Sequence, residues 1–269
     1  MEVIDNLVLS IVIPCYNEED VMPELYRRVT EIARQVAGEG RYELVLVNDG
    51  SRDTTLAKIM DYAERDPHVV GVNLSRNFGH QLALTAGLEL ARGERILVLD
   101  ADLQDPPELL PKMMELMDQG ADVVYGQRQK REGETWFKKR TAAFFYRLLR
   151  RLTDLEIPVD CGDFRLMSRR VKEGLIKMPE KQRFIRGMVA WLGYKQVALP
   201  YVRQKRFAGT TKYPLSKMIS FALDAITSFS TAPVRLSGQF AMLFTLVSLL
   251  LMLYILYSSF FGHTVPGWA

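Results

Sequence analysis

The sequence predicts an α/β domain with a mostly parallel sheet, followed by a transmembrane helix. Short apolar runs alternate with amphipathic segments of helical length between residues 8 and 125, which is the pattern of successive strand–helix–strand units. Polar side chains follow four of the apolar runs, where parallel strands would gather them at one edge of the sheet. Near the C-terminus, residues 240–261 form an uncharged stretch of 22 residues.

The first elements show how each assignment is made. Residues 8–14 are an apolar run that ends at a proline, as expected of a buried parallel strand. Residues 18–36 place Leu25, Val29 and Ile32 at helical spacing, which predicts a helix. By the same criteria we expect further strands at 42–47, 69–74, 95–99 and 122–125, and further helices ending at Tyr62, over 78–91 and over 107–117.

The polar groups at the strand exits indicate a ligand site. They are Asn17 and Glu18, Asp49, Asn77, and the pair Asp100 and Asp102. In open parallel sheets, ligands bind at the carboxyl ends of the strands. The chain has neither the Gly-x-Gly-x-x-Gly fingerprint nor the P-loop motif, which argues against a dinucleotide site and a P-loop site.

The triplet Asp100-Ala101-Asp102, with Gln104 two residues later, is the expected metal site. If the extended backbone of the strand persists, the two carboxylates point the same way. Two hard oxygen ligands suit Mg²⁺ or Mn²⁺ held jointly with substrate phosphates. A solvated turn is the alternative interpretation of the triplet alone. We expect His80 to be a local hydrogen-bonding residue, because no second histidine stands at metal-ligand spacing.

Composition narrows the class of protein. The net charge of +3 over 269 residues is too small to indicate a nucleic-acid partner. Cys15 and Cys161 lie far apart without metal-ligand spacing, as expected of a protein in a reducing compartment. The N-terminus shows no basic segment followed by an apolar run, so we expect no signal peptide.

The C-terminal segment is expected to cross a membrane. No Asp, Glu, Lys or Arg occurs from Leu236 onwards, and as a helix residues 240–261 would extend about 33 Å, against a hydrocarbon core of ~30 Å. Basic residues precede the span and none follows it, so the positive-inside rule places the N-terminal part in the cytoplasm. We therefore expect a catalytic domain over 1–211, a juxtamembrane helix over 212–235, a transmembrane helix over 236–261 and a short extracytoplasmic tail over 262–269.

Residues 135–152 interleave apolar side chains with Lys and Arg, which predicts a basic amphipathic helix. Such a helix lies on an anionic bilayer surface, or it packs on the domain as an ordinary surface helix. The sequence favours neither of these two placements on its own.

Several motifs together resemble a known family. They are IVIPCYNEE, LVNDGSRDTT, LSRNFGHQLALTAGL, VLDADLQDPPELL, VYGQR, DCGDFRLMSRR and RFAGTTKYPLSKM. These segments resemble the family 2 glycosyltransferases of the GT-A fold, in particular the polyprenyl-phosphate glycosyltransferases. The resemblance implies a Rossmann-like GT-A domain that transfers a hexose, with inversion and with Mg²⁺ or Mn²⁺, from a UDP-sugar to undecaprenyl phosphate at the bacterial inner membrane.

The ending is similar to the bacterial subgroup that glucosylates undecaprenyl phosphate for O-antigen or envelope modification, which implies glucose as the sugar. Members of that subgroup usually carry two spans, whereas this sequence shows one, so either the second span lies beyond the end of this sequence or it is absent. The partners implied are a UDP-sugar, the lipid phosphate, membrane lipid and a second copy of the chain, with no nucleic acid.

The resemblance assigns a nucleotide-binding set to the strand exits. Tyr16 offers a stacking face and Glu18 an acceptor for ribose or base, although a helix start also explains an acidic residue at position 18. Asp49 accepts from the uracil edge or belongs to an ordinary Asp-Gly turn. The complete set is Pro14, Tyr16, Glu18, Asp49, Asn77 and Asp100.

The remaining polar motifs supply the expected catalytic and phosphate-binding residues. The catalytic set is Asp160, Asp163, Arg206 and Arg128, and the acceptor- or phosphate-binding set is Arg140, Arg165 and Lys212. Guanidinium groups suit phosphate recognition, although lipid-surface attraction also explains Arg140, and Arg165 either attracts the acceptor phosphate or pairs with Asp163. A lipid monophosphate, with a second pKa of about 6, is mostly ionised at pH 7, so we expect Asp160 to position the sugar or stabilise positive charge.

Other functions share part of this pattern. A transferase for GDP-mannose or an amino-pentose would carry the same motifs and differ in its donor. A processive polysaccharide synthase would normally show more spans and a Gln-x-x-Arg-Trp motif, and neither is present here. A non-catalytic membrane module would bind a lipid-linked sugar without turnover and would tolerate Asp102→Asn.

Overall fold

The computed structural model describes residues 7–129, 161–181, 183–203 and 232–262. Within these ranges the chain forms a sheet of seven strands in the order β3-β2-β1-β4-β6-β5-β7. The strands are β1 (Leu9–Cys15), β2 (Tyr42–Asn48), β3 (Val69–Asn73), β4 (Arg95–Val98), β5 (Val123–Arg128), β6 (Cys161–Ser168) and β7 (Gln196–Tyr201). The five strands expected from the sequence are all present, and the C-terminal sheet strands β6 and β7 were not foreseen.

The sheet is mostly parallel, as predicted. Strand β1 pairs parallel with β2 and β4, β2 with β3, and β5 with β7. Only β6 runs the other way among the described strands, pairing antiparallel with both β4 and β5. Because β6 is reversed, its first residues lie at the edge where β1 and β4 end. Its register with β4 pairs Val98 with Arg165, and extending that register by two residues sets Asp100 opposite Asp163.

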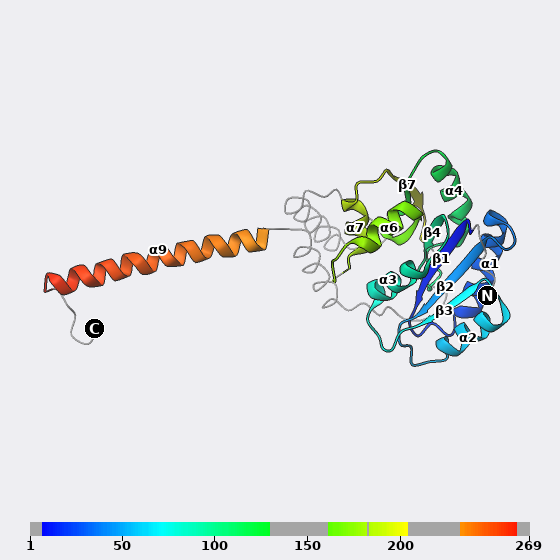
Figure 1. Cartoon of the computed structure of the whole chain (residues 1–269), viewed down its shortest axis with the longest axis horizontal. Helices are drawn as coiled ribbons and strands as arrows, with labels where there is room; N and C mark the ends of the chain where they lie inside the picture. The colour runs from blue at the N-terminus through cyan, green and yellow to red at the C-terminus, as the bar shows by residue number, and fades with distance from the viewer. Residues whose placement is uncertain (1–6, 130–160, 182, 204–231, 263–269) are drawn as a thin grey trace.

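Helices cover both faces of the sheet (Figure 1). Helices α1 (Met22–Ala37), α2 (Thr55–Arg65) and α4 (Leu110–Asp118), the last preceded by the 3₁₀ turn η1 (Pro107–Leu109), contribute to the core on one face. Helices α3 (His80–Leu90), α6 (Arg169–Lys177) and α7 (Ile185–Trp191) contribute to the core on the other. Strand residues alternate between the two cores, so Ile11 and Ile13 face α1 while Val12 faces α3.

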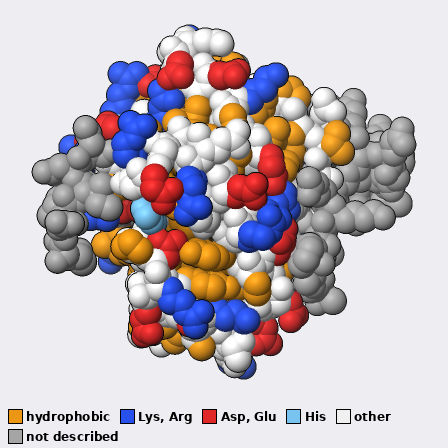
Figure 2. Space-filling view, turned by 90° about the vertical axis from the view of Figure 1, so that its right-hand side faces the viewer, with side chains coloured by type: hydrophobic (Ala, Val, Ile, Leu, Met, Phe, Trp, Pro, Cys, Tyr) orange, Lys and Arg blue, Asp and Glu red, His pale blue; other side chains and the backbone are white. Residues whose placement is uncertain are grey.

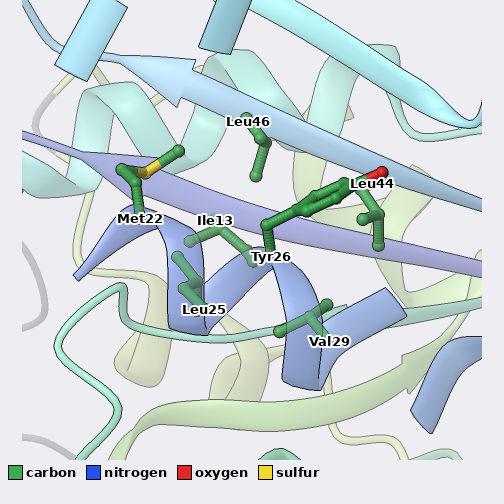
Figure 3. Close-up of a pocket in the computed structure, with 7 residues that line it drawn as sticks. All are labelled: Ile13, Met22, Leu25, Tyr26, Val29, Leu44 and Leu46. Carbon is green, nitrogen blue, oxygen red and sulfur yellow. The ribbon is translucent and has the colours of Figure 1, made fainter. Parts of the chain in front are cut away.

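Helix α1 packs its apolar stripe directly onto the sheet (Figure 3). The side chains that meet there come from α1, β1 and β2, and they leave no room for a water molecule; they are Ile13, Met22, Leu25, Tyr26, Val29, Leu44 and Leu46. On the opposite face α3 approaches the sheet at Gly87, where an added Cβ would lie 2.4 Å from Val12 Cγ1. Close packing on both faces holds the strand ends, and therefore the polar loops that follow them, in fixed positions.

The outer surface of the α1 side carries charges of both signs. Figure 2 shows Lys and Arg side chains interspersed with Asp and Glu over this face, without one large patch of a single sign. Some of these charges form pairs along α1, where Arg27 contacts Glu24 at 2.7 Å and Glu31 at 3.1 Å. Exposed pairs of this kind contribute little to stability.

The apolar C-terminal stretch forms one continuous helix, α9 (Ala232–Phe260), which extends away from the sheet in Figure 1. Residues Val234–Phe260 include an 18-residue window with a mean hydropathy of 2.4 that is not buried against the rest of the protein, so by length and composition this helix can cross a membrane. It begins four residues before the span expected at 236–261. The amphipathic helix expected at 135–152, most of the juxtamembrane helix expected at 212–235 and the tail after residue 262 lie outside the described residues.

Candidate active site

The loops after β2 and β3 are joined at the carboxyl edge of the sheet by the side chain of Asp49. Its two carboxylate oxygens accept hydrogen bonds from the backbone N–H groups of Phe78 (2.7 Å) and Gly79 (3.0 Å). The loop after β3 also presses on Gly50, whose φ is +66° and whose added Cβ would lie 2.5 Å from Asn77 N. Only glycine accommodates both the positive φ and this contact. The Asp49 carboxylate thus holds the loop after β3, and its expected contact with uracil stays a prediction.

The loop after β1 is tied to the loop after β2 in the same way. Asn17 has a φ of +52°, and its Oδ1 accepts from the N–H of Arg52 at 2.8 Å. The N–H of Glu18 donates to Thr55 Oγ1 at 2.9 Å. Of the other residues expected to bind nucleotide, Pro14 is buried within β1, Tyr16 is half-buried, and Asn77 is exposed and donates from Nδ2 to the carbonyl of Asp49 at 3.2 Å.

Asp100 and Asp102 lie on a turn after β4, which ends at Val98. The extended geometry that would aim both carboxylates the same way does not persist, because the chain turns at residues 101–102 and Leu103 adopts a φ of +54°. Asp102 Oδ1 accepts from the N–H of Gln104 at 3.1 Å, which is an Asx turn. Both carboxylates are therefore presented by a strained loop at the sheet edge.

A buried polar cluster stands beside this turn, with Asp163 at its centre. Asp163 Oδ1 accepts from Arg186 Nε at 2.9 Å, and its Oδ2 accepts from Gln81 Nε2 at 2.9 Å. His80 Nε2 lies 3.2 Å from Asp163 Oδ2 and 3.5 Å from Asp100 Oδ1. Four side chains from β6, α3 and α7 thus surround Asp100, which the register of β4 and β6 brings opposite them.

Burial and proximity set the charges in this cluster. Burial by itself lowers the pKa of His80, but the neighbouring Asp163 and Asp100 outweigh it and raise that pKa to about 9. Burial opposes ionisation of Asp163, yet Arg186 and His80 hold the pKa of that carboxyl well below its usual range. Burial raises the pKa of Asp100, and the nearby Asp163 adds to this effect while His80 opposes it. Asp163 is therefore a permanently ionised anchor and a poor proton acceptor.

A second buried carboxylate, Asp105, organises two guanidinium groups on the other side of the turn. Tyr201 donates its hydroxyl to Asp105 Oδ1, and Arg128 Nη2 lies 3.4 Å from Oδ2. Arg203 Nε lies 3.5 Å from Asp105 Oδ1, and its Nη2 lies 4.0 Å from Asp102 Oδ2. Arg128 and Arg203 thereby place two positive charges next to the turn that carries Asp102, as an anionic ligand requires.

Gly162 makes space for the first of these arginines. A Cβ at this position would lie 2.5 Å from Arg128 Nη2. The DCGDFR motif therefore contributes a small residue beside Arg128 as well as the acidic Asp163. Any larger residue at position 162 would push the Arg128 guanidinium away from Asp105.

The side chain of Arg165 is buried and bonds to the backbone. It is 2% exposed, and its Nε and Nη2 donate to the carbonyls of Asp163 (3.2 Å) and Gly162 (3.1 Å). The cation that pairs with the Asp163 carboxylate is Arg186, so the predicted pairing of Arg165 with Asp163 involves only the main chain. Four further predicted residues, Asp160, Arg140, Arg206 and Lys212, lie outside the described residues.

The described residues fit a divalent cation that is shared with a ligand. No group of three or more His, Cys, Asp or Glu side chains within the described ranges forms a closed metal cage. Asp100 Oδ1 is buried and makes no hydrogen bond within those ranges, so it is a carboxylate oxygen available to a hard cation. Together with Asp102 it supplies the two-carboxylate donor set with which Mg²⁺ or Mn²⁺ binds when phosphates complete the coordination.

Sequence reasoning did not single out Gln81, Arg186, Asp105 or Arg203. Arg186 belongs to no recognisable motif and reaches Asp163 only through the packing of α7 on β6. The useful signal was a charged pair inside a strand, since Asp163 and Arg165 on a buried β6 require partners. Asp105 directly follows Gln104, the last residue of the expected metal motif, and was therefore not included in that motif.

The fold is that of a GT-A glycosyltransferase. The chain belongs to glycosyl transferase family 2, whose profile matches residues 10–175. It is 49% identical to the uncharacterized glycosyltransferase YkcC of Bacillus subtilis over 98% of this chain and 81% of that protein. It is 40% identical to the prophage bactoprenol glucosyl transferase homolog of Escherichia coli, covering 97% of this chain and 85% of that protein.

A solved structure supports the fold independently. The glucosyl-3-phosphoglycerate synthase of Mycobacterium tuberculosis, crystallised with Mn²⁺, UDP and glucosyl-3-phosphoglycerate, superposes with a TM-score of 0.57 at 18% identity. The match covers 81% of this chain and 77% of that one. At this level of identity the likeness establishes the shared GT-A fold.

Proposed function

We propose that this glycosyltransferase moves glucose from UDP-glucose to undecaprenyl phosphate, with inversion, at the cytoplasmic face of the bacterial inner membrane. The observation that carries the proposal is the meeting, at one sheet edge, of the Asp100–Asp102 turn with the Arg128 and Arg203 guanidinium groups. Carboxylates for a cation beside two arginines form a site for a diphosphate rather than for a neutral sugar.

The choice of donor and acceptor is supported by likeness and by α9. A 40% identical relative bears the name bactoprenol glucosyl transferase homolog, and a GT-A neighbour was crystallised with UDP and Mn²⁺. The apolar residues Val234–Phe260 are long enough to hold the domain at a bilayer, where a polyprenyl phosphate presents its head group. The positive-inside rule applied to Arg235 favours a cytoplasmic catalytic domain.

In the proposed reaction an oxygen of the acceptor phosphate forms a bond to the anomeric carbon. The bond from that carbon to the donor phosphate oxygen breaks, and its electron pair leaves with UDP. One displacement without a protein nucleophile inverts the anomeric configuration. The acceptor phosphate is mostly ionised near pH 7, so the displacement needs no general base, which agrees with the absence of a proton-accepting role for Asp163.

The residues of the site would hold and neutralise the leaving group. A divalent cation on Asp100 and Asp102, with Gln104 following in the same turn, would supply charge neutralisation for the departing diphosphate. Arg128 and Arg203 would contribute further positive charge from the other side of the turn. His80, Gln81 and Arg186 would keep Asp163 in place and Asp100 beside it. The loops tied by Asp49 and Asn17 would receive the nucleoside, with Tyr16 as a stacking surface.

The test is a transfer assay with the purified chain in detergent, labelled UDP-glucose, Mn²⁺ and undecaprenyl phosphate. We expect label to move into the organic phase, and we expect Asp102→Asn to remove that transfer. UDP-galactose, UDP-N-acetylglucosamine and GDP-mannose tested in parallel identify the sugar. Binding of donor without transfer from any of these sugars would contradict an enzymatic function.

A further inference from the structure

The side chain of Arg203 lies between the carboxylates of Asp105 and Asp102. Its Nε is 3.5 Å from Asp105 Oδ1 and its Nη2 is 4.0 Å from Asp102 Oδ2. The Nε atom is buried and donates no hydrogen bond within the described part of the chain. A buried N–H group without an acceptor is unfavourable, so this guanidinium is placed for an acceptor that the described residues do not supply.

Asp105 cannot be the dedicated partner of Arg203. The same carboxylate already accepts from the Tyr201 hydroxyl and faces Arg128 at 3.4 Å. Burial, and then the nearby Arg128 charge, lower the pKa of Arg203, whereas Asp105 and Asp102 oppose this shift. With one buried carboxylate between two guanidinium groups, Asp102 is the second anion on which the charge of Arg203 depends.

We propose that Arg203 is the counter-ion of Asp102 in the metal-free enzyme, and that its guanidinium turns to the donor diphosphate when a divalent cation binds there. This inference rests on the proposed metal-dependent function and assigns a diphosphate-binding residue to its site. The Arg203 Nη2 atom lies 4.0 Å from Asp102 Oδ2. A cation bound to Asp102 repels the guanidinium and neutralises the carboxylate charge that attracts it. A diphosphate oxygen then gives the buried Nε an acceptor and matches the geometry of the guanidinium fork.

The proposal has a consequence that a merely structural arginine would not show. Arg203 opposes binding of the metal alone and favours binding of the diphosphate once the metal is present. Such opposed effects on two ligands amount to a coupling free energy between them. Removing the side chain should therefore strengthen one affinity and weaken the other.

The experiment measures binding rather than turnover. The 269-residue chain is purified in detergent, free Mn²⁺ is followed by electron paramagnetic resonance, and UDP affinity is measured at saturating Mn²⁺. For Arg203→Gln we expect Mn²⁺ alone to bind roughly fivefold more tightly, and UDP with Mn²⁺ to bind roughly fivefold or more weakly. Arg203→Lys keeps the charge without the fork, so its Mn²⁺ affinity should match the original chain while its UDP affinity falls.

Arg170→Gln is the matched control, because Arg170 pairs with Asp122 away from the site and neither affinity should change. Unchanged or weaker Mn²⁺ binding by Arg203→Gln overturns the proposal. If Arg203→Gln does not fold, as a melting curve will show, an unchanged UDP affinity in Arg203→Lys overturns it. If the original chain binds no Mn²⁺ even with UDP, the metal-dependent function itself fails. If Mn²⁺ binding depends on Asp102 but not on Arg203, only the present inference fails.

Discussion

Arg186 Nε donates to Asp163 Oδ1 over 2.9 Å, and this bond joins helix α7 to the reversed strand β6 at the rim of the site. Asp163 is 3% exposed, so its negative charge has little access to water. A buried carboxylate requires a paired cation and hydrogen-bond donors, and Arg186, Gln81 and His80 provide them. The position of Asp100 therefore depends on a residue from a helix that lies more than eighty residues further along the chain.

Arg186→Gln should destabilise the fold. Removing one partner leaves the Asp163 carboxylate buried with less compensation, and breaking a buried pair in this way costs about 3–5 kcal/mol. Chemical denaturation of the detergent-solubilised chain measures the free energy of unfolding. Arg27→Gln, which removes an exposed pair with Glu24, is the control and should cost less than about 1 kcal/mol. Equal effects of the two substitutions would contradict the role given to Arg186.

Stability should fall between pH 6.5 and pH 9 because of His80. Its pKa is about 9 in the folded protein against a usual 6.5, so the folded state holds the proton more tightly. The stabilisation is complete below pH 6.5 and is lost as pH rises through 9, by roughly 3 kcal/mol in total. Denaturation curves across this range, with metal removed by a chelator, test the effect. In His80→Gln the free energy of unfolding should change less with pH over this range. An unchanged pH dependence would show that other groups cause it.

Asp49→Asn should weaken the fold and not only nucleotide binding. Both Asp49 oxygens accept backbone N–H groups, and an amide side chain can replace only one of these acceptors. One partly buried N–H is then left without its acceptor, at a cost of about 1 kcal/mol. Melting temperature and the KM for the UDP-sugar should be measured together. A raised KM with no loss of stability would show that Asp49 acts on the nucleotide alone.

Removal of divalent metal should abolish transfer, and Mn²⁺ or Mg²⁺ should restore it. Asp100 and Asp102 make a two-carboxylate donor set rather than a closed cage, so the metal should exchange readily and bind better with UDP than without it. Activity after chelation and re-addition of each metal tests the first expectation, and Mn²⁺ titration with and without UDP tests the second. Glu108→Gln, which removes an exposed partner of Arg28, should leave both measurements unchanged.

The N-terminal half of the fold could be predicted because each element there follows a simple hydrophobic period. Strands β1 and β2 are buried at every position, and α1 repeats its apolar residues every three or four positions. Strand β6 is harder to recognise, because Asp163 and Arg165 interrupt its apolar run. The partners that allow Asp163 to be buried come from α3 and α7. Strand β7 carries a proline at an edge of the sheet, which also weakens the signal.

The site was predictable where it follows strand exits and not where it depends on tertiary contacts. The Asp100–Asp102 turn, Asp49 and Arg128 all belong to local motifs, and the structure gathers them at one edge. Arg203 and Arg186 reach the site from β7 and α7, and nothing in their sequence neighbourhood indicates a partner. The alternation of side chains along a strand does not apply to Asp100 and Asp102, because the strand ends at Val98 before either residue.

The reversed direction of β6 has a consequence for how this enzyme can diversify. Strand β5 ends at Arg128 and β6 begins at Cys161, so the chain leaves the sheet and returns to it at the rim of the same site. Residues inserted, removed or exchanged between those two points need not shift any strand register. The sheet and its carboxylates can therefore stay constant while the segment between them changes to suit a new acceptor or surface, with the exception of Arg140 and Asp160, which are predicted to belong to the site.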